Sequence, residues 1–223
     1  MKRKILFSLM TIALVGALIG GGIYAYFSDV ETSTGNTFTA GTLNLKVGDD
    51  DPTTVSISVP DLKPTDTGSA ATWVTKNIGS ITGTLDVAIG SITNNENTLT
   101  EPESAAGDAT GGATEGELGS FLEVAVWLDV DESGTWTSGD IALQSDGSTL
   151  TSTGVEPLPY DYLDNYGGDS HTSLITMTGD DSAAGGTDEF QFMVDYDFPS
   201  DANDDQTQSD SAVFDVTFTL NQA

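Results

Sequence analysis

The sequence lacks cysteine, has a single histidine, and sets six basic residues against 35 acidic ones among 223 positions. The absence of cysteine excludes disulfide bonds and thiol catalysis. With His171 alone, neither an HExxH zinc motif nor a three-histidine site can be built. The shortage of lysine and arginine argues against nucleic-acid binding, which needs cations to neutralise phosphates. We therefore expect no enzymatic activity and no nucleic-acid partner.

No basic residue follows Lys76, whereas 28 aspartates and glutamates do. Side-chain ion pairs cannot form within that part of the chain, so its carboxylates must be solvated or bound to cations. An acidic surface kept soluble by self-repulsion, or adapted to high salt, explains most of them. Calcium binding need explain only a few.

The N-terminus has the layout of a signal peptide. Three basic residues, Lys2 to Lys4, precede an almost charge-free run from Ile5 to Ile23, and small residues follow up to Ala25. We expect residues 1–25 to be removed on export, which leaves one domain of about 198 residues. Because the run is also long enough to span a bilayer, a retained anchor is the alternative.

Apolar residues recur at every second position in several short runs, which predicts strands with one buried face. The runs lie at Leu43–Val47, Val55–Val59, Leu85–Ile89, Phe190–Tyr196, and from Val213 or Phe214 to Leu220. Leu118–Val130 fits a helix or a strand, and we predict a strand. Turn-rich residues at 94–117 predict a loop. Eight to ten short strands in one exported domain predict an all-β fold, a single β-sandwich of jelly-roll type.

Several blocks of the sequence are similar to one known family. They are GGGIYAYFSD (20–29), NTFTAGTLNL (36–45), VPDLKPTDT (59–67), VTKNIGSITGTLDV (74–87) and DSAVFDVTFTLNQ (210–222). In order and spacing they resemble the TasA/camelysin family, which includes bacterial biofilm-matrix fibre subunits and archaeal bundling-pilus subunits. The blocks cover about a third of the chain, and residues 94–185 have no counterpart among them.

The resemblance implies a secreted, cell-surface filament subunit. It implies a domain order of signal peptide (1–25), N-terminal donor segment (26–37) and jelly-roll domain (38–223). The donor strand, Tyr26, Phe27, Ser28, Asp29, Val30 and Glu31, would enter a second copy of the chain after a signal peptidase has acted. No stable membrane insertion would remain after cleavage. The alternatives are that residues 26–38 form the first strand of their own domain, and that the chain is a monomeric, membrane-anchored surface binding module with calcium-stabilised loops.

One acidic stretch has the spacing of a calcium loop. Asp129, Asp131, Ser133, Thr135 and Asp140 fall at EF-hand positions one, three, five, seven and twelve, and Gly134 at position six allows the sharp turn. The backbone carbonyl of Thr135 would be the ligand at position seven. The pattern predicts structural calcium, with an acidic hairpin as the alternative. A second group, Asp201, Asp204 and Asp205, lacks such spacing, and we expect it to be solvated.

Overall fold

A computed structural model describes residues 3–5, 7, 10, 11, 13, 41–48, 54–59, 62–181, 186–200 and 204–223. The chain divides into two compact units, 1–40 and 41–223. The described residues of the first unit are helical. The predicted donor strand, 26–31, and the predicted cleavage region lie outside the described residues. Over the ranges given above, no helix is both long enough and apolar enough to cross a membrane.

Among its described residues, the second unit is mostly β, with few helices. Its strands are β1 (Leu45–Val47), β2 (Thr54–Val59), β3 (Thr67–Asn77), β4 (Gly83–Ile89), β5 (Thr93–Asn95), β6 (Glu123–Asp129), β7 (Ile141–Leu143), β8 (Thr149–Thr151), β9 (Asp161–Tyr162), β10 (Ser170–Met177), β11 (Glu189–Asp197) and β12 (Ser211–Gln222). Short helices are α2 (Glu101–Ala106), α3 (Leu118–Phe121), η1 (Leu163–Tyr166) and η2 (Asp204–Thr207).

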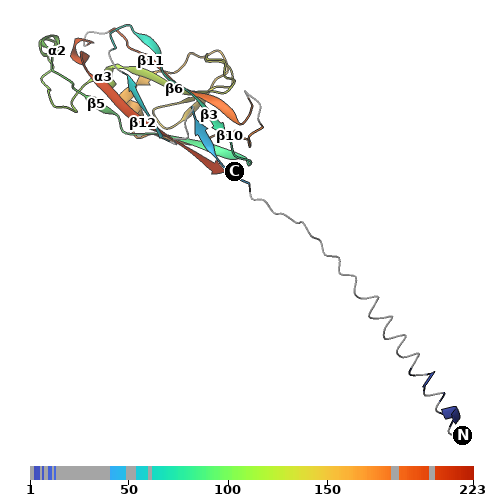
Figure 1. Cartoon of the computed structure of the whole chain (residues 1–223). Coiled ribbons are helices and arrows are strands. Elements are labelled where there is room, and N and C mark those ends of the chain that lie inside the picture. Colours follow the sequence, from blue (N-terminus) through green and yellow to red (C-terminus); the bar gives the residue numbers. More distant parts are fainter. Residues whose placement is uncertain are drawn as a thin grey trace. The chain divides into compact units, whose positions relative to one another are not determined.

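The strands form two antiparallel sheets (Figure 1). One has the order β1-β3-β11-β6-β7-β8, with β9 paired to β6, and the other has the order β10-β4-β12-β2, with β5 paired to β12. Residues from both sheets contribute to one hydrophobic core. The all-β prediction is confirmed, whereas the jelly-roll type stays a prediction.

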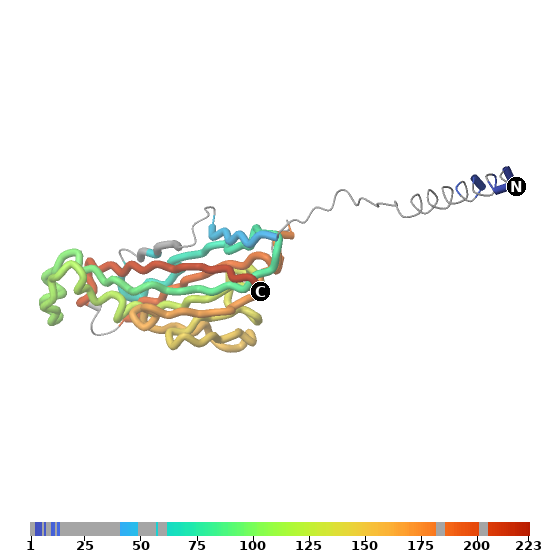
Figure 2. Tube along the Cα trace, turned by 90° about the horizontal axis from the view of Figure 1, so that it is seen from below, coloured from blue at the N-terminus to red at the C-terminus, as the bar shows by residue number. Residues whose placement is uncertain are grey.

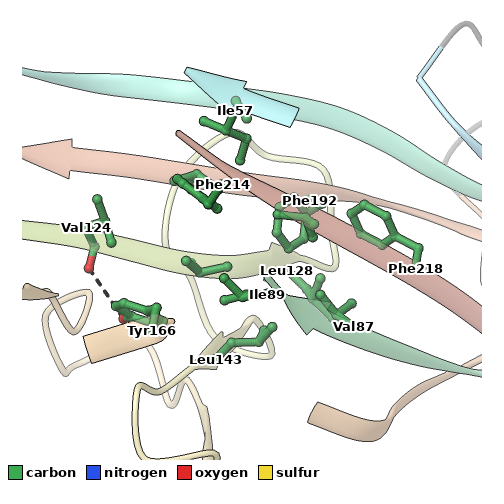
Figure 3. Packing of buried hydrophobic residues seen from close by; sticks show 14 of the residues in the cluster. Ile57, Val87, Ile89, Val124, Leu128, Leu143, Tyr166, Phe192, Phe214 and Phe218 are labelled. Carbon is green, nitrogen blue, oxygen red and sulfur yellow. Dashed lines mark hydrogen bonds between the residues drawn. The ribbon is translucent and has the colours of Figure 1, made fainter. Parts of the chain in front are cut away.

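The alternating runs form the predicted strands because each gives one face to the core. In β4, Leu85, Val87 and Ile89 are buried, and the residues between them are partly exposed. In β12 the buried face consists of Ala212, Phe214, Val216 and Phe218, so it includes Phe214 and not Val213. Phe218 lies opposite Val87 in the register between β12 and β4, which places the two side chains on the same face (Figure 3).

The segment Leu118–Val130 contains both of the structures that its pattern fits. It begins with the single turn of α3 and continues as β6, so the prediction of a strand throughout was wrong for the first five residues, Leu118–Leu122. Strand β6 is buried on both faces. Trp127 belongs to a second, smaller core, where it contacts Trp136 edge to face at 5.6 Å and donates a hydrogen bond to Asp195 at 2.9 Å. A strand covered on both sides loses the simple alternation that marks the other strands.

The region predicted as a loop, 94–117, begins with the end of β5 and holds α2. Pro102 lies in the first turn of α2, and the Glu103 side chain accepts a hydrogen bond from the Thr100 backbone N–H, which fixes where the helix begins. Gly107 ends it with a φ of 99°, a conformation that favours glycine. Figure 2 shows this green segment at the end of the body away from the C-terminus.

Three aromatic rings connect the sheets at the centre of the core. Phe192 of β11 stacks on Trp73 of β3 with 5.9 Å between ring centroids, and meets Phe218 of β12 edge to face at 5.0 Å. Phe192 is fully buried. Phe192 therefore contacts an aromatic ring in each of the two sheets.

We expect Phe192→Ala to lower the free energy of unfolding by about 3–5 kcal/mol, because the truncation removes buried area and leaves a cavity. Urea unfolding followed by tryptophan fluorescence measures the change. Val155→Ala is the control, since Val155 is 87% exposed and should change stability by less than about 0.5 kcal/mol. Equal stabilities for the two variants would contradict this account of the core.

Candidate metal centre

The predicted calcium loop connects β6 to β7. Asp129 is the last residue of β6 and Asp140 precedes β7, so the sheet itself fixes both ends of the loop. One carboxylate oxygen from each of Asp129, Asp131 and Asp140 lies within 4.8 Å of the other two. The structure therefore brings together the three carboxylates that the sequence spacing selects.

Backbone N–H groups of the loop point at these carboxylates. Asp129 accepts hydrogen bonds from the N–H groups of Ser133 at 3.1 Å and Gly134 at 2.6 Å. Asp140 accepts from Val130 at 2.9 Å and Thr137 at 2.7 Å. The tight turn depends on positive φ angles at Glu132 and Gly134.

The two predicted ligands that are not carboxylates contact each other. The Ser133 hydroxyl donates a hydrogen bond to the Thr135 carbonyl at 2.9 Å, so the two oxygens that would bind the cation are bonded to each other. A cation bound as predicted would take the place of this hydrogen bond. The local geometry is compatible with either alternative for the loop, the calcium site or the acidic hairpin.

The electrostatics of the loop differ between its buried and exposed carboxylates. Asp129 and Asp140 are fully buried, whereas Asp131 is exposed. Burial raises the pKa of Asp129, and a hydrogen bond from Ser133 lowers that of Asp131. An oxygen-only ligand set suits a hard cation such as calcium or magnesium rather than zinc, which prefers nitrogen and sulfur.

His171 lies in β10 and is only 2% exposed. Neither ring nitrogen has a hydrogen-bond partner within the described part of the chain. Burial lowers the pKa of His171, so the neutral ring is favoured. Neither of the acidic groups in the described ranges includes this residue.

A second acidic group was not predicted from the sequence. Glu96, Glu117 and Asp210 each place a carboxylate oxygen within 4.8 Å of the other two. They come from three separate segments, so no spacing motif connects them. Asp201 and Asp204 of the other predicted cluster have no described side chain, and Asp205 is exposed.

Comparison with known proteins identifies the relatives of this chain. A family model described as "Camelysin metallo-endopeptidase" matches residues 1–223. The chain belongs to the TasA/camelysin family. This confirms the resemblance in the sequence, and membership of the TasA/camelysin family is consistent with a secreted, cell-surface or biofilm-matrix protein.

The other comparisons add little to the family match. No curated protein matches the chain significantly. A solved structure titled "Structure of infectious bursal disease virus Gt strain" matches with a TM-score of 0.16 and 10% identity, over 86% of this chain and 46% of that one. A TM-score this low carries no argument about fold or function.

The family description contradicts our expectation that the chain has no enzymatic activity, since it names a metallo-endopeptidase. That expectation rested on the missing histidine and cysteine ligands. Carboxylate oxygens also hold metal ions, and the structure gathers two such groups. The residues present do not form a histidine-based zinc centre, so no catalytic step through zinc follows from them.

Proposed function

We propose that the chain is the subunit of an extracellular filament, and that its N-terminal segment, Tyr26–Glu31, adds as a strand to a second copy. The observation that carries the proposal is a groove of about 390 Å³ beside the C-terminal half of β12. The groove is lined by Leu43, Asn44, Leu45 and residues 217–220. Family membership and the apolar character of Tyr26, Phe27 and Val30 support it.

The pairing of β12 explains why a strand could be added here. On one side, β4 pairs with β12 from Val216 to Gln222. On the other side, β2 pairs with β12 only as far as Thr217. Beyond Thr217, no strand among the described residues pairs with that second edge. Unpaired backbone N–H and C=O groups next to apolar side chains are what an incoming strand needs.

The energy of one joint follows from the residues that it buries. At about 25 cal/mol per Å², burial of two aromatic side chains contributes several kcal/mol before ordering costs are subtracted. Like-charge repulsion opposes the contact, because cleavage after residue 25 would leave 35 acidic and 3 basic residues, a net charge of −32. Salt or divalent cations screen that repulsion and should strengthen assembly.

Deleting residues 26–31 from the mature protein should abolish fibres and leave a monomer of unchanged stability. The reason is that the segment would complete a neighbour's sheet rather than its own. Negative-stain microscopy scores the fibres, and thermal unfolding compares the monomers. A large loss of monomer stability would instead make the segment the first strand of its own domain, and unchanged fibres would exclude it as the donor.

A groove variant gives the complementary test. Leu220→Asp should block the acceptor but leave the donor intact, while Val155→Asp, at a fully exposed position, should still form fibres. Mixing the deletion variant with Leu220→Asp should give a dimer and nothing longer, since only one joint can form. Native mass spectrometry reads the result, and absence of this dimer would contradict the proposed polarity of the joint.

We also propose that the Asp129–Asp140 loop binds calcium in a structural role. Asp129→Asn and Asp140→Asn should each remove one bound calcium ion in isothermal titration calorimetry and part of the rise in Tm that calcium produces. Each change removes a ligand charge and keeps the side-chain shape. Asp205→Asn, at an exposed position, is the control. Unchanged calcium binding in both loop variants would favour the acidic hairpin.

The family description supports a second candidate function, metal-dependent peptide hydrolysis. Purified protein should then cleave denatured casein, and EDTA should stop the cleavage. Variants of the two acidic groups show which, if either, holds the metal that the activity needs. If casein stays intact with calcium, magnesium, manganese or zinc added in turn, this candidate fails, and the filament test is unaffected.

A further inference from the structure

Five carboxylates converge at the end of the body where β5, α2 and α3 gather (Figure 1). They come from four segments of chain. Glu96 follows β5, Glu103 lies in α2 and Asp108 follows it, Glu117 precedes α3, and Asp210 precedes β12. Oxygens of Glu96, Glu117 and Asp210 lie within 4.8 Å of one another, and Glu103 and Asp108 are close enough to raise the pKa of Glu96.

In four of the five carboxylates, one of the two oxygens is hydrogen-bonded. Glu103 accepts a hydrogen bond from the Thr100 N–H, and Asp210 accepts one from the Glu117 N–H at 2.7 Å. Thr110 serves the other two: its N–H and hydroxyl donate to Asp108 at 2.7 and 2.6 Å, and its hydroxyl lies 2.9 Å from Glu117. These contacts fix the orientation of each side chain.

The remaining oxygens of the cluster are buried and accept no hydrogen bond from any donor among the described residues. They are Glu96 Oε1 and Oε2, Glu103 Oε1, Asp108 Oδ2, Glu117 Oε2 and Asp210 Oδ1. Glu96 is 5% exposed, so both of its oxygens are removed from water. A buried carboxylate without a partner is strongly unfavourable, and such a group is expected to bind a cation or a proton.

No ion pair reaches the cluster from any lysine, arginine or histidine in the described ranges. The sequence also contains no lysine or arginine beyond Lys76. Five acidic side chains therefore lie near one another without a cationic partner from the described residues.

We propose that Glu96, Glu117 and Asp210 bind a calcium ion, and that Glu103 and Asp108 strengthen the site through their negative charge. Calcium takes six to eight oxygen ligands, water among them, and these three side chains offer four unpartnered oxygens, with both Glu96 oxygens available for bidentate binding. The site contains no nitrogen or sulfur ligand, which disfavours zinc. Its mix of long glutamate and short aspartate side chains suits the flexible geometry of calcium better than the strict octahedron of magnesium.

The ion would fasten the segment 96–117 to the start of β12. Hydrogen bonds already connect the same parts: the Ser209 hydroxyl donates to the Thr98 carbonyl at 2.9 Å, and Gln206 Nε2 donates to the Ala106 carbonyl at 3.2 Å. Without a cation, repulsion among the carboxylates acts against these contacts. Calcium would turn the repulsion into attraction, and its site would differ from the β6–β7 loop in both position and ligands.

Protons are the alternative occupants. Burial and the neighbouring carboxylates raise the pKa of Glu96 to about 7, and burial also raises the pKa of Asp210. A cluster that holds only protons would be stabilised by acid and indifferent to calcium. A cluster that binds calcium would gain stability from calcium at neutral pH.

The test is calorimetric calcium titration of the full mature chain at pH 7.5, with thermal unfolding of the same samples. Glu96→Gln and Asp210→Asn should each weaken one calcium site by at least about tenfold, as expected for the loss of a charged ligand. Each should also lose part of the calcium-dependent rise in Tm. Glu101→Gln, at an exposed position of the neighbouring helix α2, should bind as the wild type does.

Combining Glu96→Gln with Asp129→Asn separates the two calcium sites. The double variant should bind one ion fewer than Asp129→Asn alone, whether or not the loop site binds calcium. In EGTA, Glu96→Gln should be at least as stable as the wild type, which shows that it folds. Wild-type calcium binding by both Glu96→Gln and Asp210→Asn, or a cluster stabilised by acid alone, would overturn the proposal.

Discussion

The shortage of cationic side chains constrains the rest of this structure. Lys76 of β3 shows how far one cation is shared: its ammonium lies 3.6 Å from Asp180, 3.3 Å from Asp188 and 3.1 Å from Glu189. Asp188 is fully buried, and the ion pair with Lys76 supplies its counter-charge. A network with one cation and three carboxylates cannot be repeated further along a chain that has no other basic residue after it.

Backbone N–H groups donate hydrogen bonds to carboxylates that have no lysine partner. Hydrogen bonds from Thr153 lower the pKa of Glu156 to about 2, and the N–H groups of the β6–β7 loop satisfy Asp129 and Asp140 in the same way. Turns supply such donors because their N–H groups are not used by a sheet. The five carboxylates of the Glu96 cluster have more oxygens than the described donors satisfy, and we expect a cation from solution to bind there.

The sequence predicts those features that depend on neighbours along the chain. Alternation in β4 and β12 specifies a buried face, and the spacing from Asp129 to Asp140 specifies a loop that gathers carboxylates. Strand β6 is harder to predict from the sequence, because Trp127 packs into a second core on the face that alternation assigns to solvent. The Glu96 cluster could not be predicted, since Asp210 reaches it only through the pairing of β12 with β5.

Strand β12 connects the features proposed for function. Asp210, just before its first residue, belongs to the five-carboxylate cluster, and residues 217–220 near its other end line the groove. In between, Phe214, Val216 and Phe218 belong to the core, so the strand is held along most of its length. A cation that orders the start of β12 would favour the same conformation of β12 with which an incoming segment pairs. Calcium and strand addition would then stabilise one conformation, and by linkage each would strengthen the binding of the other.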